Sequence, residues 1–257
     1  MEVMSIGEPM TAPVSGDQLS PLHTSKAQSW LTCLALSLAV PALYLSIQKL
    51  LAVFVPATLH GSTIQRYCIG ITALTSAEWI VVLVLLALLH SRGETLRDLG
   101  TWRWGTWLAW VIALGITLLS VANGLRILPR LGIPRSAIFQ PTLFHIYAAL
   151  LIGITAGFCE EVIFRGFMMT EFARMGYGKL VQVVVPGFFF GLAHLAFLKH
   201  GVGVAVGVMV PTAIMGMIWG TAYLVGRRGL LPCMVAHFLN DSTALPWILF
   251  FMVSHKI

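Results

Sequence analysis

The stretch LFHIYAALLIGITAGFCEEVIFRGF, residues Leu143–Phe167, joins an apolar run to a group of charges. Nearly every residue in 143–157 is apolar, and Glu160, Glu161 and Arg165 follow closely. A helix that spans a membrane needs about 20 mainly apolar residues. The stretch therefore predicts a spanning helix with three charges near its end. An ionisable side chain at mid-membrane costs about 2.5–3.5 kcal/mol, so each charge requires a partner or a function.

The rest of the chain has the same apolar character. Of its 257 residues, 58% are hydrophobic and 10% are charged, whereas soluble domains average about 45–50% and about 25%. This composition indicates an integral membrane protein that crosses the bilayer several times. The net charge of +6 comes mostly from Lys and Arg in short connections between apolar runs, where basic residues lie beside lipid headgroups. We therefore expect the lipid bilayer as a partner, and no nucleic acid.

The length rule predicts an all-α, polytopic transmembrane helix bundle of about seven spans, with six or eight as alternatives. The predicted spans are 30–55, 67–90, 106–124, 143–164, 180–198, 202–225 and 230–252. Pro41 interrupts the first and Pro246 the last. Because proline removes a backbone donor inside a helix, each of these two could be one kinked helix or two pieces.

These spans divide the chain into three parts. Residues 1–28, rich in Pro, Ser and Gly, predict a disordered N-terminal tail. Residues 29–142 hold the first three spans and a segment, 91–105, in which charges alternate with Leu and Trp. That mixture predicts an amphipathic segment at the membrane interface. Residues 143–257 hold the last four spans.

Polar residues interrupt three successive predicted spans, each with a companion four residues away. In the first, Glu161 lies four residues before Arg165, the favourable order for an ion pair on one helix face. Glu160 points about 100° away and has no partner in its own segment. The second interruption is Phe190 with His194, where the imidazole has no acid nearby in sequence. Three such interruptions favour one shared site over three unrelated polar positions.

The third interruption is His237 with Asp241, with Asn240 beside them. A histidine and a carboxylate four residues apart can orient one another on one helix face. A carboxylate and an imidazole can together take a proton from water, and a second imidazole can donate to the oxyanion that forms on an attacked carbonyl. The chain has no GxSxG, HExxH or GxGD pattern, which argues against serine, zincin and aspartyl protease sites.

Two further features are expected to be structural. Glu78, in SAEWIVVLVLLALL, is interpreted as a residue near the interface or a cap of its span, with a functional role as the less favoured alternative. Gly187 and Gly191, and Gly216 and Gly220, are four residues apart. Small residues at this spacing let helix backbones approach closely in lipid, so we expect helix packing here and no site.

The motifs EEVIFR, FGLAH and HFLND resemble, in order and spacing, the EExxxR, FxxxH and HxxxN/D motifs of the CPBP family. This is the CAAX prenyl protease and bacteriocin-processing family, also called the Abi family. The resemblance covers residues 143–247 and implies that the last four spans, in residues 143–257, form the catalytic core. It implies an intramembrane endopeptidase that hydrolyses a peptide bond of a membrane-associated or lipid-modified protein or peptide. Prenylated CAAX peptides, peptide leaders and C-terminal sorting tails are all substrates compatible with it, and a bacterial inner membrane is the expected location.

The resemblance also implies roles for individual residues. Glu160 would be the catalytic glutamate and His194 its partner in activating water, while His237 and Asp241 would stabilise the oxyanion. The residues implied as support of the site are Glu161, Arg165, Phe190 and Asn240. Asp241 departs from the asparagine typical of eukaryotic CAAX-processing members. An ionised carboxylate cannot donate to an oxyanion, so Asp241 would orient His237 or carry a proton in its apolar setting.

Metal involvement has two alternatives. Glu160, His194 and His237 could hold zinc with an open fourth position, as catalytic zinc sites require. We favour glutamate-activated water with no required cofactor, because no extra carboxylate is evident to act as base if Glu160 bound zinc.

A different class of function is a non-catalytic immunity or scaffold protein, in which the same residues form a polar packing network. A proton-coupled transporter is a weaker alternative, because transporters of this kind show inverted repeats with paired broken helices, and none is visible here.

Overall fold

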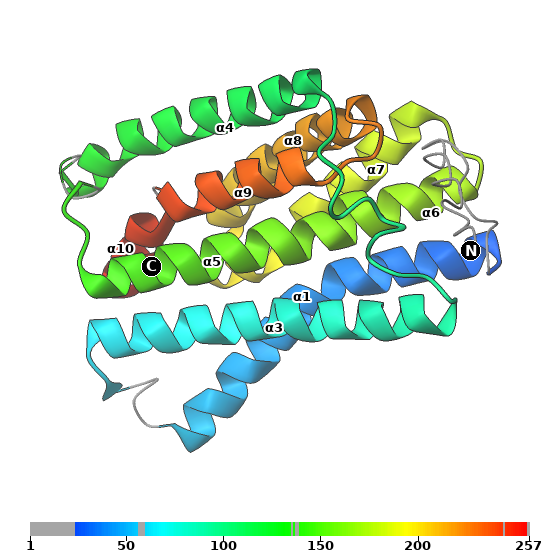
Figure 1. Cartoon of the computed structure of the whole chain (residues 1–257). Coiled ribbons are helices and arrows are strands. Elements are labelled where there is room, and N and C mark those ends of the chain that lie inside the picture. Colours follow the sequence, from blue (N-terminus) through cyan, green and yellow to red (C-terminus); the bar gives the residue numbers. More distant parts are fainter. Residues whose placement is uncertain (1–23, 56–59, 135, 137–138, 244, 256–257) are drawn as a thin grey trace, which may run out of the picture.

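The computed structural model describes residues 24–55, 60–134, 136, 139–243 and 245–255, and its architecture is an all-helical bundle, as predicted. Figure 1 shows the helices lying side by side along one common direction. The α-helices are α1 (Lys26–Phe54), α3 (Thr63–Ser91), α4 (Trp107–Ile127), α5 (Leu143–Glu161), α6 (Met169–Arg174), α7 (Lys179–Leu192), α8 (Val202–Val225), α9 (Leu231–Thr243) and α10 (Leu245–His255). A π-helical segment, η3 (Val162–Met168), joins α5 to α6 without a break.

Five helices in the described part are long and apolar enough to cross a membrane: α1, α3, α4, the continuous helix 143–174, and α8. The other two predicted spans are shorter than the expected length of about 20 residues. Span 180–198 is the 14-residue α7 followed by a 3-10 segment, η4 (Leu195–His200). Span 230–252 is two helices, α9 and α10. The first span, in contrast, is one helix that contains Pro41.

The helix 143–174 lies at the centre of the bundle. Figure 1 places α3 and α1 on one side of it and α9, α8 and α4 on the other. In its most apolar stretch of 18 residues, 61% of the residues are buried, against 17% in the corresponding stretches of α4 and α8. The charged residues Glu160, Glu161 and Arg165 therefore occupy the protein interior, where lipid does not reach them.

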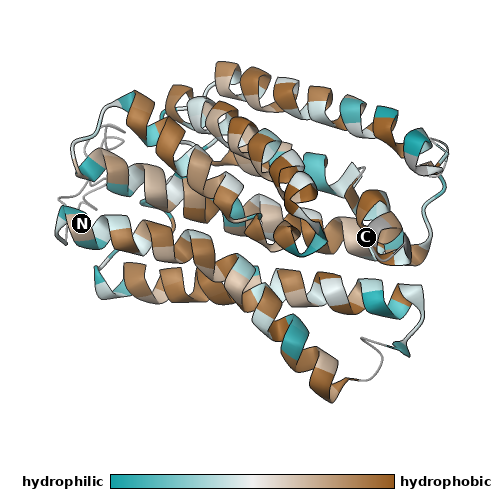
Figure 2. Cartoon of the chain, turned by 180° about the vertical axis from the view of Figure 1, so that it is seen from behind, coloured by the Kyte–Doolittle hydropathy of each residue, from teal (hydrophilic) through white to brown (hydrophobic). Residues whose placement is uncertain are grey.

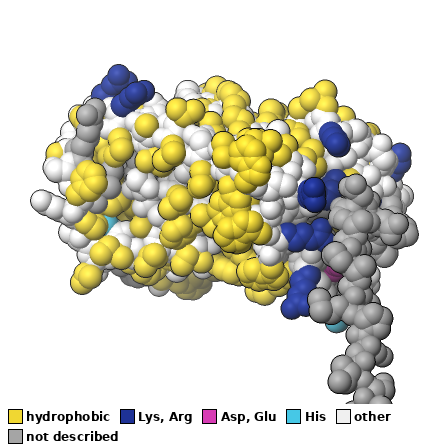
Figure 3. Space-filling model, turned by 45° about the horizontal axis from the view of Figure 1, so that its top comes forward, with side chains coloured by type: hydrophobic (Ala, Val, Ile, Leu, Met, Phe, Trp, Pro, Cys, Tyr) yellow, Lys and Arg dark blue, Asp and Glu magenta, His cyan; other side chains and the backbone are white. Residues whose placement is uncertain are grey.

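The outer faces of the bundle are apolar. Figure 2 shows hydrophobic residues along the helices, with hydrophilic residues more frequent toward their ends. On α4, Leu118 and Leu119 are each 69% exposed. Figure 3 shows the same arrangement on one face, with hydrophobic side chains across the middle and Lys and Arg toward the two ends. Apolar surface between basic ends matches a bilayer between its headgroups, and the chain is an integral membrane protein.

Glycines set the distance between α5 and α9. A Cβ atom on Gly157 would lie 2.9 Å from the carbonyl oxygen of Met234, and one on Gly153 would meet the Ser242 hydroxyl. The predicted close approach through Gly187, Gly191 and Gly216 occurs between α7 and α8. Gly220 has only ordinary contacts there. Close packing of α5 on α9 brings the end of α5 against His237.

The N-terminal tail and the segment 91–105 differ in how far the structure tests them. Helix α1 begins at Lys26, capped by Ser25, so residues 26–28 of the predicted tail are helical; residues 1–23 lie outside the described part. The segment 91–105 consists of turns and irregular backbone at one end of the bundle. Leu99 is fully buried, whereas Trp102 and Trp104 are 64% and 67% exposed.

A buried charge cluster, which we call the α6 cluster, lies at this end of the bundle. Glu171 of α6 accepts a hydrogen bond from the Ser29 hydroxyl at 2.9 Å and pairs with Arg92 at 3.2 Å and Arg174 at 3.0 Å. Arg174 also pairs with Glu94 at 2.8 Å. The cluster ties α1 and the segment after α3 to α6.

Candidate active site

The site is built on a buried ion pair at the junction of α5 and η3. The Arg165 guanidinium donates to Glu161 Oε1 at 2.8 Å, as the spacing predicts, and both side chains are almost fully buried. The guanidinium also lies over the ring of Phe190, 4.3 Å from its centroid, and over that of Trp219 at 5.4 Å. These ring contacts compensate part of the cost of burying the cation.

The helix widens where this pair forms. The seven residues of η3 are π-helical and begin directly after Glu161. Single π-helical turns are rare and occur often at functional sites. Here the irregular turn carries Arg165 while leaving Glu160 and Glu161 on regular α-helix.

His237 of α9 joins the two glutamates. Its Nδ1 lies 2.8 Å from Glu161 Oε1, and because a carboxylate only accepts, Nδ1 carries the proton. This bond directs Nε2 to Glu160 Oε2 and Asp241 Oδ2, each 3.5 Å away. The Trp219 ring flanks the imidazole, with centroids 4.5 Å apart. The link from Glu161 to His237 was not predicted, because residues 76 positions apart give no spacing signal.

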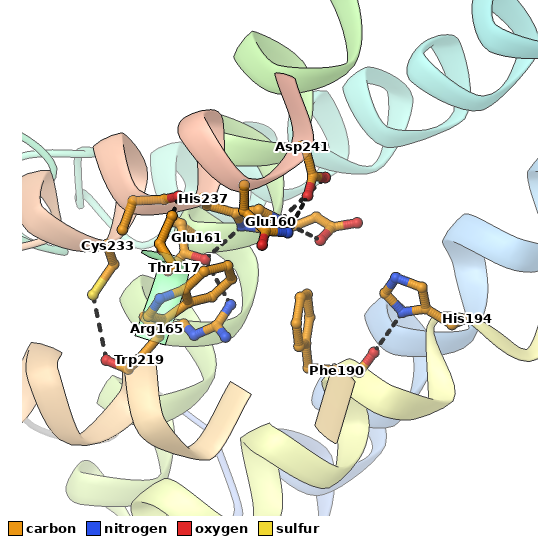
Figure 4. A network of polar contacts seen from close by, with 12 residues as sticks. Thr117, Glu160, Glu161, Arg165, Phe190, His194, Trp219, Cys233, His237 and Asp241 are labelled. Carbon is orange, nitrogen blue, oxygen red and sulfur yellow. Dashed lines mark hydrogen bonds and ion pairs between the residues drawn. The ribbon is translucent and has the colours of Figure 1, made fainter. Parts of the chain in front are cut away.

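Asp241 lies on the same face of α9 as His237, in the orienting position that their spacing predicts. Its Oδ1 accepts a hydrogen bond from the Asn240 side-chain amide at 2.7 Å. Asn240 thus acts on Asp241 rather than directly on the imidazole. Figure 4 shows Glu160 and Asp241 converging on His237, with Glu161 and Arg165 behind it.

His194 lies at the other side of the site. It follows the end of α7 with φ −90° and ψ 11°, a sparsely populated backbone region where many active-site residues lie. Its Nδ1 bonds the carbonyl oxygen of Phe190 at 3.0 Å, and the two rings are edge to face at 5.4 Å, so the predicted pairing of these residues is confirmed. Nδ1 therefore carries the proton and Nε2 is the acceptor. His194 makes no direct ion pair with Glu160 among the described side chains.

One cavity of about 780 Å³ connects these groups. Glu160, His194, His237 and Asp241 all line it, and Phe190, Trp219 and Asn240 complete its polar end. The volume lies within the range of about 300–1,000 Å³ typical of ligand sites. Much of the remaining lining is apolar and comes from α3, α5 and α10. Gln48, Arg66, Lys199 and His200 add polar groups to the lining, so the cavity can hold a substrate with both apolar and polar segments.

Glu78 also lines this cavity, and sequence reasoning misjudged it. The residue is 3% exposed and lies in the middle of α3, far from either helix end, so the interpretation as an interfacial or capping residue is wrong. The signal that could have found it is helical spacing. Ile71, Leu74 and Glu78 share one face of α3, and all three line the cavity.

The zinc alternative names Glu160, His194 and His237 as ligands, and all three line the cavity. Within the described ranges, no group of three or more His, Cys, Asp or Glu residues is placed to hold a metal ion. Of the three named ligands, His237 and Glu160 are in contact, with Nε2 3.5 Å from Oε2. The premise used against zinc, that no extra carboxylate is present, is nevertheless wrong, because Glu78 lines the same cavity.

Comparison with known proteins identifies a family for the part of the chain that carries the site. Residues 141–243 match a family model described as Type II CAAX prenyl endopeptidase Rce1-like. No curated protein and no solved structure gives a significant match. The matched range contains all four predicted catalytic residues, whereas Glu78 lies outside it.

Proposed function

We propose that this chain is a CAAX-type intramembrane endopeptidase in which Glu160 activates the attacking water, and the match of residues 141–243 to the Rce1-like family supports the proposal. The observation that carries the proposal is the pairing of His237. Its Nδ1 is fixed on Glu161, so its Nε2 faces Glu160 and Asp241 at 3.5 Å inside a substrate-sized cavity.

Glu160 and His194 act on water in the first step. Glu160 extends from α5 toward the side of the site where His194 lies (Figure 4). The Nε2 of His194 is free to accept a proton because Nδ1 donates to Phe190. A water held between these two groups loses a proton to Glu160 as its oxygen attacks the carbonyl carbon.

His237 stabilises the oxyanion that this attack creates. In its imidazolium form, the ring donates through Nδ1 to Glu161 and keeps its Nε2 proton for the oxyanion. Donors fixed in a site that excludes water are worth about 3–4 kcal/mol to the transition state. Asp241 stabilises the imidazolium and holds its orientation. Asp241 stands where eukaryotic CAAX-processing members typically have asparagine. Its proposed role differs, because it pairs with the charge on His237 instead of donating a hydrogen bond to the oxyanion.

The proposed substrate is a membrane-associated or lipid-modified protein or peptide, taken from the bilayer of a bacterial inner membrane. The apolar lining of the cavity accommodates a lipid chain or apolar residues beside the scissile bond. No metal or other cofactor is required in this proposal. Cleavage should therefore continue after exhaustive chelation, and loss of activity that zinc alone restores would contradict that part.

The proposal is tested with a prenylated CAAX-type peptide that carries a fluorophore and a quencher on either side of the scissile bond. Purified wild-type protein should cleave it, and Glu160→Gln should lower the rate by about 10²–10⁴-fold, the usual contribution of an acid–base group. Glu171→Gln is the matched control, because it alters a buried glutamate in the α6 cluster. Full activity of Glu160→Gln would instead favour the scaffold alternative.

A further inference from the structure

Glu78 is a buried carboxyl group that the mechanism above does not use. It is 3% exposed, and its Oε2 is buried without a hydrogen-bond partner. Burying such a group costs free energy, and a buried oxygen left unpaired costs about 1–3 kcal/mol or more. A packed helix would reach a lower free energy with an apolar residue here, so the carboxyl group requires another explanation.

Two helix faces bring Glu78 toward Glu160. On α3, the residues that line the cavity are spaced along one face: Tyr67, Gly70, Ile71, Leu74 and Glu78. On α5, the lining residues are Ile152, Ala156 and Glu160, again one turn apart. The two helices pack together and run in the same direction (Figure 1). The lining face of α3 therefore ends at the carboxyl group of Glu78, and that of α5 at the carboxyl group of Glu160.

Trp79 fixes the two helices in this register. Its indole Nε1 donates to the Thr155 hydroxyl at 3.1 Å, and its ring stacks on Phe158 with centroids 5.5 Å apart. Because Trp79 follows Glu78 and binds α5 in the two turns before Glu160, the two carboxyl groups lie at a similar depth. Glu78 is held there by packing rather than by a polar contact of its own.

Acidic side chains outnumber cations on the part of the cavity wall that holds Glu78. Glu160 and Asp241 line the same cavity as Glu78, and His237, which also lines it, is already shared among three other acids. An ionised Glu78 would be a buried charge with no cation of its own, which costs several kcal/mol. The site therefore holds one carboxyl group that can give a proton beside another that can take one.

We propose that Glu78 is a second acid–base residue of the active site, which donates a proton to the leaving amine when the peptide bond breaks. This inference rests on the proposed function. Glycosidases and aspartic proteases likewise divide acid and base roles between two carboxyl groups in different environments. Here Glu78, in the middle of α3, would supply the acid, and Glu160, beside His237, would be the base.

The proton transfers balance over one cycle. Water gives one proton to Glu160, and its oxygen forms the new C–O bond. The C–N bond then breaks with its electron pair going to nitrogen, which takes the proton from Glu78. The products are a carboxylic acid and an amine, and Glu160 returns a proton to Glu78 through the cavity that both line. No oxidant, reductant or metal is required.

The experiment compares two leaving groups in purified full-length protein. One substrate is the quenched peptide; the other has the same sequence with a thioester in place of the scissile amide. An amine must be protonated to leave, whereas a thiolate leaves without a proton. Glu78→Gln should lower kcat for the amide by about 10²-fold or more, with KM unchanged, while the thioester rate stays close to that of the wild type. Glu78→Asp should restore part of the amide rate.

Three controls separate the possible outcomes. Glu160→Gln should slow both substrates, so a wild-type protein that cleaves neither, or a Glu160→Gln variant that cleaves both, contradicts the proposed function. Equal loss of both rates in Glu78→Gln, or no loss, overturns the role of Glu78 alone. Infrared difference spectra give a readout independent of activity. The carbonyl band of a protonated carboxylic acid should be weaker in Glu78→Gln and unchanged in Glu171→Gln; an unchanged band in Glu78→Gln also overturns the proposal.

Discussion

The protein buries two clusters of charge, and they differ in how completely the charges are paired. In the α6 cluster, each of the two acids and two arginines has an opposite charge within 3.2 Å. Among the described residues of the active site, Glu161 and Arg165 form the one such pair of permanent charges, and His237 also lies 2.8 Å from Glu161. Glu160 and Asp241 share His237 at 3.5 Å, and Glu78 has no ion pair among the described side chains.

This difference distinguishes charges that hold the helices together from charges that are available to a reaction. Buried charges that neutralise one another hold helices together, and this role does not require a cavity beside them. Carboxyl groups in excess of the available cations raise the free energy of the folded state, and a protein keeps them where a reaction uses them. The excess carboxyl groups here all face the same cavity.

The largest effect on stability is expected from breaking the one complete pair at the active site. Arg165→Met leaves Glu161 as a buried charge without its cation, so the free energy of unfolding should fall by about 3–5 kcal/mol. Thermal denaturation in detergent measures this. A double variant, Arg165→Met with Glu161→Gln, should recover part of the loss. A double variant no more stable than the single one would show that the pair is not a unit.

A smaller effect, on rate rather than stability, is expected at His237. His237→Gln removes the proposed oxyanion donor and should lower kcat by about 10²–10³-fold. The midpoint of thermal denaturation should change less than in Arg165→Met, because a glutamine amide can still donate to Glu161. Cleavage at the wild-type rate would show that His237 does not stabilise the transition state.

The contact between α5 and α9 can be loosened without altering a charge. Gly157→Ala places a methyl group 2.9 Å from the Met234 carbonyl oxygen, and overpacking of this kind costs about 1–3 kcal/mol. The separation of α9 from α5 should also lower kcat. Gly203→Ala is the matched control, because a Cβ there meets nothing within 4 Å. Equal behaviour of the two variants would argue against close packing at Gly157.

The smallest effect is expected in the α6 cluster. Ser29→Ala removes one hydrogen bond to Glu171 but leaves both arginines in place. The free energy of unfolding should fall by about 1 kcal/mol, and kcat should not change. A large loss of activity with unchanged stability would break the distinction between the two clusters.

The sequence predicts the parts of this molecule that depend on local spacing. Helix class, the pair of Glu161 with Arg165, and the positions of His194 beside Phe190 and of Asp241 beside His237 all follow from residues four apart. The bond from Glu161 to His237 and the depth of Glu78 depend on which helix faces meet, and a single sequence does not determine that. Apolar content alone also does not reveal where α7 ends or where the last predicted span divides into α9 and α10.

The central claim is that excess carboxyl groups serve catalysis and paired ones serve structure. It is tested most directly by measuring cleavage rate per folded molecule and thermal stability for Glu160→Gln and Glu171→Gln side by side. The account predicts that Glu160→Gln loses cleavage and keeps its stability, while Glu171→Gln melts at a lower temperature and cleaves normally. Normal cleavage by Glu160→Gln, or loss of cleavage in folded Glu171→Gln, would contradict it.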